Sequence, residues 1–133
     1  MNAVASTLMS LTAIRVSDLR RSVEFYTEGC GFTHERDLHM PSFLASIVRG
    51  GVAGLELVSP IDGETEARVD HGNMFIKTVV NVDSVERRMT SACVHGGVEV
   101  TPLTHLANYG MIIGSVRDPD GYLVEFVERT QAR

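Results

Sequence analysis

Cysteine is scarce in this sequence. The chain has two cysteines among 133 residues, four prolines and no tryptophan. Cys30 and Cys93 form neither a CxxC pair nor a His/Cys spacing typical of a zinc site, so we expect two reduced thiols without a catalytic role. A chain of this length buries roughly 65–70% of its unfolded surface, so a hydrophobic core is enough to hold the fold without disulfides.

Two other features are missing: a long apolar segment and a cluster of basic residues. The uncharged stretch from Met1 to Thr12 contains several Asn, Ser and Thr residues and no basic region, so we expect it to be neither a signal peptide nor a membrane span. Twelve Lys and Arg residues stand against seventeen Asp and Glu, and the basic residues are scattered. A nucleic-acid partner needs a concentrated positive surface. We therefore expect a cytoplasmic protein that binds neither nucleic acid nor membrane.

The composition that is present, 44% hydrophobic and 22% charged, is typical of a soluble globular protein. The length fits a single domain over residues 1–133. In the first half, residues 8–16 have the pattern of a strand, and Ser17 or Asp18 stands where a helix N-cap is expected. An apolar helix face follows at Leu19, Val23 and Tyr26, and glycines end the helix. Strands are then expected at 32–37, 42–48 and 53–58.

The second half repeats this order. We expect a strand at 74–82, a helix at 85–94 and strands at 98–103, 111–116 and 123–127, with residues 59–73 as a polar linker. A shift of 66 residues carries Val16 onto Val82 and Gly31 onto Gly97, and such a duplication fixes the architecture. The sequence predicts an α+β fold of two βαβββ modules, about residues 8–58 and 74–128. Their curved sheets would surround a shared cleft, where small ligands usually bind.

Three stretches of sequence resemble a known family. They are IRVSDL at residues 14–19, GLEL at residues 54–57, and DPDG followed by YLVEF at residues 118–126. These motifs are similar to those of the vicinal oxygen chelate superfamily, a glyoxalase-like group that includes glyoxalase I, bleomycin-resistance proteins and extradiol dioxygenases. The resemblance covers the chain from about Leu8 to Glu128. It implies the two-module fold and a small-molecule substrate or ligand.

The resemblance also implies four metal-ligand positions. Members with a metal place one ligand on the first strand and one on the last strand of each module. Those positions correspond here to Leu11, Glu56, Lys77 and Glu125. Leucine has no donor atom, and a protonated lysine repels a divalent ion. We therefore expect no metal and no other cofactor.

Glu56, Lys77 and Glu125 remain as candidate catalytic residues, and two interpretations are open. In the first, they face solvent or form an ion-pair cluster that fills the place of a lost metal. In the second, the lysine keeps one carboxylate ionised while the other is protonated more readily, so that the two act as base and acid. The ammonium of Lys77 could then stabilise a developing enolate.

Five further positions are candidate substrate contacts: Leu11, Arg15, Phe43, His105 and Tyr109. Arg15 shares the strand face of Leu11, so it could bind an anionic group. The five histidines of the chain do not have a spacing typical of a metal site. His71 lies six residues before Lys77, so it could serve as a metal ligand only if the chain before Lys77 followed a different path from that of the family.

The function favoured by this pattern is a metal-independent lyase or isomerase that acts on a small oxygenated organic molecule. The alternative is a non-catalytic protein that sequesters a drug or metabolite, as bleomycin-resistance proteins do, followed by a metal-dependent glyoxalase or dioxygenase. Small curved sheets leave strand edges exposed, which predicts a homodimer.

Overall fold

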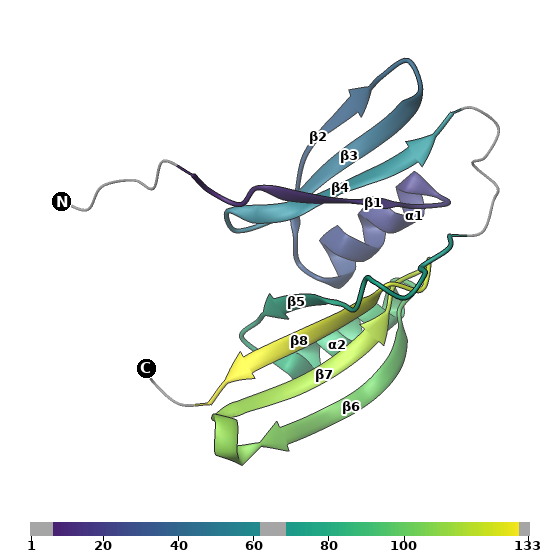
Figure 1. The fold of residues 1–133 in the computed structure, drawn as a ribbon. Helices are drawn as coiled ribbons and strands as arrows, with labels where there is room; N and C mark the ends of the chain where they lie inside the picture. Colours follow the sequence, from purple (N-terminus) through teal and green to yellow (C-terminus); the bar gives the residue numbers. More distant parts are fainter. Residues whose placement is uncertain (1–6, 62–68, 131–133) are drawn as a thin grey trace.

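The computed structural model describes residues 7–61 and 69–130 (Figure 1). The first module is a four-stranded sheet with one helical segment, in the strand order β1-β4-β3-β2 with β1 parallel to β4. Its elements are β1 (Leu11–Arg15), α1 (Leu19–Glu24), a π-helical turn η1 (Phe25–Gly29), β2 (Thr33–His39), β3 (Phe43–Gly50) and β4 (Ala53–Pro60).

The second module has the same topology, with strand order β5-β8-β7-β6 and β5 parallel to β8. Its elements are β5 (Thr78–Asn81), α2 (Val85–Val94), β6 (Val98–Leu106), a 3-10 turn η2 (Ala107–Tyr109), β7 (Met111–Arg117) and β8 (Leu123–Arg129). The predicted pair of βαβββ modules is confirmed. Within the predicted linker, residues 62–68 lie outside the described residues.

Both parallel edge strands are shorter than the sequence pattern indicates. β5 begins at Thr78 rather than Met74, and β1 begins at Leu11 rather than Leu8. Thr78 is paired with Val124, the second residue of β8, so the residues before it have almost no partner strand to bind. Apolar alternation alone therefore overestimates the length of a strand when the alternating pattern extends beyond the end of the partner strand.

Polar side chains begin the two α-helices. Asp18 accepts a hydrogen bond from the backbone N–H of Arg21, and Ser84 accepts one from that of Arg87. The helix α2 has a second cap, because the carboxylate of Glu128 accepts from the backbone N–H of Val85 at 3.0 Å. These bonds satisfy N–H groups that have no partner inside a helix.

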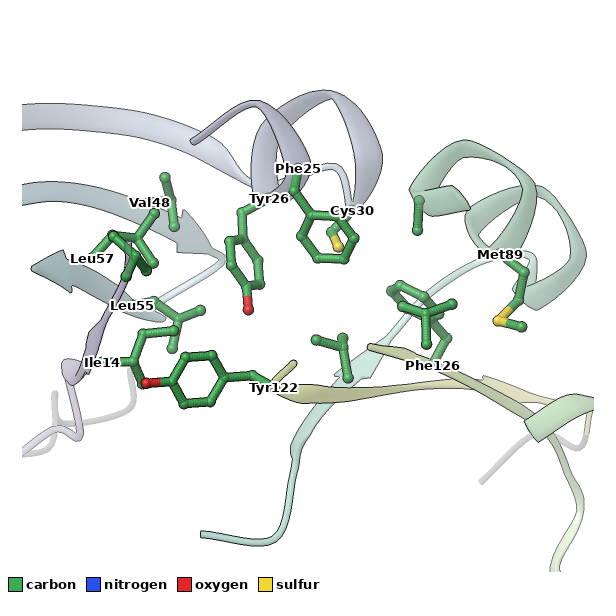
Figure 2. Close-up of a cluster of buried hydrophobic side chains, with 14 of the residues drawn as sticks. Ile14, Phe25, Tyr26, Cys30, Val48, Leu55, Leu57, Met89, Tyr122 and Phe126 are labelled. Carbon is green, nitrogen blue, oxygen red and sulfur yellow. The ribbon is translucent and has the colours of Figure 1, made fainter. Parts of the chain in front are cut away.

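One hydrophobic core joins the two modules. Figure 1 shows α1 on the side of the first sheet that faces the second module, and Figure 2 shows side chains of both modules in one cluster. Phe25 and Tyr26 of η1 pack there with Leu57 of β4 and Phe126 of β8, and each of these is at most 1% exposed. The helices thus cover one face of each sheet. We call the face without a helix the open face of that sheet.

The DPDG turn fastens the second module to the first. The hydroxyl of Tyr26 donates to the Asp118 carboxylate at 2.6 Å, and the hydroxyl of Tyr122 donates to the carbonyl of Arg15 at 2.8 Å. Asp120 accepts from the backbone N–H of Ser17 at 3.1 Å and from its hydroxyl. Side-chain hydrogen bonds therefore cross the module junction beside the apolar core.

The outer edges of the two sheets are irregular. β2 is an edge strand with five ionisable side chains, and its pairing shifts between His34 and Arg36. β6 is the other outer edge, and it contains Pro102 and two register shifts. Among the described helices, none combines the length and the apolar character that crossing a membrane requires.

Candidate functional site

Lys77 and Glu125 form an ion pair on the second sheet. Glu125 lies on β8 between the buried Val124 and Phe126, so its side chain points to the open face. Lys77 directly precedes β5, and its Nζ donates to Oε1 of Glu125 at 3.0 Å. The side chains are 37% and 19% exposed, so water screens the attraction and the pair adds little stability. The ammonium keeps further N–H donors for a ligand.

Glu56 occupies the equivalent position on the first sheet. It lies on β4 between Leu55 and Leu57, both buried in the core, so its side chain also points to an open face. Its cross-strand neighbours are Ala13 on β1 and Ile47 on β3. Among the described residues, no hydrogen bond or ion pair involves the Glu56 side chain, so a half-buried carboxylate stands among apolar neighbours.

The three candidate catalytic residues therefore divide into a pair and a single residue. Lys77 and Glu125 touch on the second sheet, whereas Glu56 lies on the first sheet and contacts neither within the described part of one chain. The shared core separates the open faces, because it fills the space between the helix-covered faces of the two sheets. A site that uses all three residues must bring two open faces together.

Three of the predicted substrate contacts share the open face of Glu56. Leu11 is paired with Gly54, Arg15 with Val58, and Phe43 with Pro60, which places these side chains on the same side of the sheet as Glu56. Arg15 is exposed, and its backbone carbonyl accepts a hydrogen bond from the hydroxyl of Tyr122 in the second module.

The other two predicted contacts lie elsewhere. His105 of β6 is paired with Ile112, whereas Ser115 is paired with Glu125, so alternation along β7 puts His105 on the face opposite Glu125. Tyr109 is in η2 and is 71% exposed. The register shifts in β6 decide the direction of His105, and a sequence pattern does not reveal them.

A cleft of about 920 Å³ lies between the modules, beside the edge strands β1 and β5. Leu11 and Lys77 line it, together with residues from the turn after η1 and from α2. Glu56 and Glu125 are not among its lining residues. This volume is in the range of small-molecule sites.

Burial shapes the chemistry of the module junction. Burial raises the pKa of Asp118, and the hydrogen bond from Tyr26 opposes that shift. The pKa of Tyr26 is raised well above its ordinary value by burial and by the negative charge of Asp118. The phenol therefore keeps its proton, and the pair is a structural hydrogen bond rather than a proton relay.

Comparison with known proteins agrees with this architecture. The model of the Glyoxalase/Bleomycin resistance protein/Dioxygenase superfamily matches residues 8–126. The chain belongs to this superfamily.

Relatives within the superfamily include the lactoylglutathione lyase of Haemophilus influenzae, which is 26% identical over 125 residues, 92% of this chain and 93% of that protein. Glyoxalase I from Zea mays superposes with a TM-score of 0.81 at 23% identity, over 93% of this chain and 45% of the larger maize protein. Glyoxalase I of Leishmania major superposes with a TM-score of 0.75 at 26% identity, over 92% of this chain and 87% of that one.

The donor set of this superfamily member does not fit a metal. Of the four ligand positions that the resemblance implies, Leu11 offers no donor and Lys77 offers an ammonium that is already bonded to Glu125. Within residues 7–61 and 69–130, no three His, Cys, Asp or Glu side chains are grouped to hold an ion. His71, the histidine nearest to Lys77 in sequence, places Nε2 2.8 Å from the carbonyl oxygen of Asp120 and packs against Tyr122.

Sequence reasoning missed two features of this member. The turn at DPDG was expected, but its carboxylates also accept hydrogen bonds from Tyr26 and Ser17, about a hundred residues away. Asp residues in a tight turn usually accept hydrogen bonds from backbone N–H groups of the same turn. Asp118 also does this, because it accepts from the backbone N–H groups of Asp120 and Tyr122. Arg88, which lines the cleft, was the second omission, and the alternation of apolar residues in α2 gives no signal for it.

Proposed function

We propose that the protein is a metal-independent lyase or isomerase that moves a proton on, or eliminates a group from, a small oxygenated organic molecule. The observation that carries the proposal is the Lys77–Glu125 pair at 3.0 Å, which involves two of the four positions where the resemblance implies metal ligands. A cation is thus still present where related enzymes use a metal, and it is held by the carboxylate of the last strand.

The side chains divide the work as follows. Lys77 is held by Glu125 and keeps N–H donors that can stabilise an oxyanion. Glu56 has no protein partner among the described residues, so its carboxylate is free to accept a proton. Glu125 positions the ammonium and can exchange a proton through it or through water.

The proton and electron balance is simple. Glu56 removes a proton from the carbon beside a carbonyl group, the C–H electron pair forms a carbon–carbon double bond, and the carbonyl π pair moves to the oxygen, which accepts a hydrogen bond from Lys77. In an isomerase the carbon that lost its proton carries a hydroxyl group, so the intermediate is an enediolate. The oxyanion takes up a proton, the hydroxyl group loses one and becomes the new carbonyl, and the former carbonyl carbon receives the proton held by Glu56. In a lyase the oxyanion re-forms the carbonyl, and the enolate electron pair forms a double bond to the carbon on the other side of the deprotonated one. The leaving group on that carbon departs with its bonding pair and takes up a proton. Neither route needs an oxidant or a reductant.

This division of labour requires a homodimer, because Glu56 and the ion pair lie on different sheets of one chain. We propose that the open face of the first sheet of one chain lies against the open face of the second sheet of the other. Each site then contains Lys77 and Glu125 from one chain and the partner subunit's Glu56. Large apolar side chains exposed just before the two inner edge strands support such an interface: Leu8, Met9, Met74 and Ile76.

Proton abstraction can be measured before the substrate is known. A panel of small ketones and hydroxy ketones is incubated with the protein in D2O, and the exchange of carbon-bound protons is followed by NMR. Glu56→Gln and Glu125→Gln should each slow exchange by about 10²–10⁴-fold, the usual weight of general acid–base catalysis. The matched control is Glu99→Gln, an exposed residue of the outer strand β6, which should leave the rate unchanged.

Two results would contradict the enzyme proposal. The first is an unchanged exchange rate in both Gln variants. The second is a rate that disappears with a chelator and returns with a divalent metal. Tight binding of a panel member without any exchange would instead support a sequestering protein.

Mixing variants tests the shared site. A Glu56→Gln chain and a Glu125→Gln chain are each inactive, but a hybrid dimer contains one site with all three native residues. With random pairing, half the dimers are hybrids, so about a quarter of the native rate should return. Light scattering on the same samples should give twice the 14.5 kDa chain mass. No recovery in a proven dimer would contradict the shared site.

A further inference from the structure

The cleft between the modules has an excess of positive charge. Lys77, Arg87 and Arg88 line it, and Asp83 is the one acidic residue among the described residues that line it. Lys77 is paired with Glu125, but no ion pair within the described part of the chain involves Arg87 or Arg88. The cleft therefore presents two guanidinium groups that have no counter-ion among residues 7–61 and 69–130.

Arg88 is fixed in position by the turn that follows η1. Its guanidinium lies over Gly31, where an added Cβ would stand 3.0 Å from the Arg88 Cζ. Gly31 has φ +86°, a conformation that glycine adopts readily. Nη1 of Arg88 also lies 3.5 Å from the carbonyl oxygen of Gly29. The side chain is half-buried and oriented by backbone groups, so little freedom is lost when its remaining donors bind a ligand.

The rest of the cleft is apolar or weakly polar. Leu11, Phe32, Phe75 and Val79 contribute apolar surface, and Ser10 and Thr12 contribute hydroxyl groups. Partial burial of a guanidinium without a counter-ion is unfavourable, and an anion removes that cost. A small inorganic ion would leave most of a cleft of about 920 Å³ empty.

We infer that the cleft between β1 and β5 binds an organic anion, whose carboxylate, sulfonate or phosphate group pairs with Arg88 and whose apolar body lies against Leu11, Phe32 and Phe75. This site adjoins the proposed catalytic pair through Lys77, which lines the cleft, whereas Glu56 and Glu125 do not line it. It does not require that the protein be an enzyme.

Two fluorescent probes with the same ring system test the inference. 1-Anilinonaphthalene-8-sulfonate carries a sulfonate, and N-phenyl-1-naphthylamine is its uncharged counterpart. The native protein should bind one sulfonate probe per chain. Arg88→Gln should weaken the sulfonate probe by about tenfold, the usual effect of losing a charged hydrogen bond, and should change the affinity of the uncharged probe by less than about twofold. Arg88→Lys should retain most of the sulfonate affinity.

The matched control is Arg20→Gln, an exposed arginine on α1 outside the cleft, which should bind both probes as the native protein does. Equal weakening of both probes by Arg88→Gln, at an unchanged melting temperature, would overturn the inference, as would no weakening of either. Binding that falls as the protein is concentrated would also overturn it, because a second copy would then fill the cleft. Displacement of the sulfonate probe by phenyl phosphate, but not by equal inorganic phosphate, would support an organic ligand.

Discussion

Tyr26 and Asp118 join the modules through a buried hydrogen bond of 2.6 Å. In Tyr26→Phe the carboxylate stays buried with one donor fewer, so the free energy of unfolding should fall by about 1–3 kcal/mol. Urea denaturation at neutral pH measures this loss. Tyr109→Phe, which removes a hydroxyl from an exposed side chain, is the control and should change stability very little.

The pH dependence of that loss has a definite sign. Burial raises the pKa of Asp118 in the folded state above its pKa in the unfolded chain. The stability that Asp118 contributes is therefore fully present at a pH below the unfolded-state pKa, and it is lost as the pH rises through the folded-state pKa. The Tyr26 hydroxyl opposes the shift, so Tyr26→Phe raises that folded pKa further. The cost of the substitution should therefore be smallest below about pH 4 and grow toward pH 7. An equal cost at every pH would contradict the charged hydrogen bond.

The two cysteines should differ in reactivity. Burial and the nearby Asp118 raise the pKa of the Cys30 thiol, and Arg88 lowers it only in part. Cys93 is exposed on α2. Because the thiolate is the reactive form, iodoacetamide should label Cys93 alone in the native protein and both residues in denaturant. Fast labelling of native Cys93→Ser would contradict this prediction.

Which polar residues could be assigned from the sequence depends on how local their partners are. Asp18 and Ser17 were equal candidates for the first N-cap, and the structure assigns Asp18. Ser17 instead binds Asp120, 103 positions along the chain. A partner at that distance follows from the packing of the modules, which no local pattern contains.

The two helical segments differ by one residue. The first has six α-helical and five π-helical residues, and the second has ten α-helical residues. A π-turn is the usual way to accommodate one extra residue in a helix. As a result Gly31, at φ +86°, corresponds structurally to Gly96, at φ +104°, although the repeat in the letters aligns it with Gly97.

Gly97 has a different role, because it allows neighbouring atoms to approach the backbone closely. A Cβ at this position would lie 2.9 Å from the carbonyl oxygen of Ala92 and 2.9 Å from Cε1 of Phe25. Gly97→Ala should therefore lower the free energy of unfolding by about 1–3 kcal/mol, as overpacking does. Gly114→Ala is the comparison, because there the three nearest atoms belong to side chains, those of Met89 and Val85 at 3.0 Å or more, and none of the three is a backbone atom. Urea titrations in which Gly114→Ala costs as much as Gly97→Ala would contradict this explanation.

Among the elements, the order and type of strands and helices were predictable, and α2 was predicted with its observed bounds, Val85–Val94. Alternation of apolar residues and helix-capping residues are local features of the sequence, so they are enough to predict the order and type of the elements. The facing of His105 was not predictable, because it depends on the register shifts of β6. Grouping Glu56 with Lys77 and Glu125 followed from the superfamily resemblance, and the sequence pattern did not predict that the core would separate Glu56 from the other two.

The two modules should unfold as one unit. Their core is shared, and the Tyr26–Asp118 and Tyr122–Arg15 hydrogen bonds cross the junction. We expect residues 1–133 to behave as a single domain with one urea transition. Far-UV circular dichroism reports both sheets, and Tyr26 and Tyr122 report the junction in the near-UV. The two curves should coincide, and a junction signal that disappears first would contradict a single domain.

The irregular outer edges affect how molecules meet in a concentrated solution. A straight, apolar edge strand is a template on which further chains can add in register. On β2 the alternating charges and the shift at His34 and Arg36 disfavour such growth, and on β6 Pro102 lacks the N–H that a ladder needs. Fibril growth is thus discouraged at both outer ends, which leaves the inner strands β1 and β5 as the edges where a specific, self-limiting association can form.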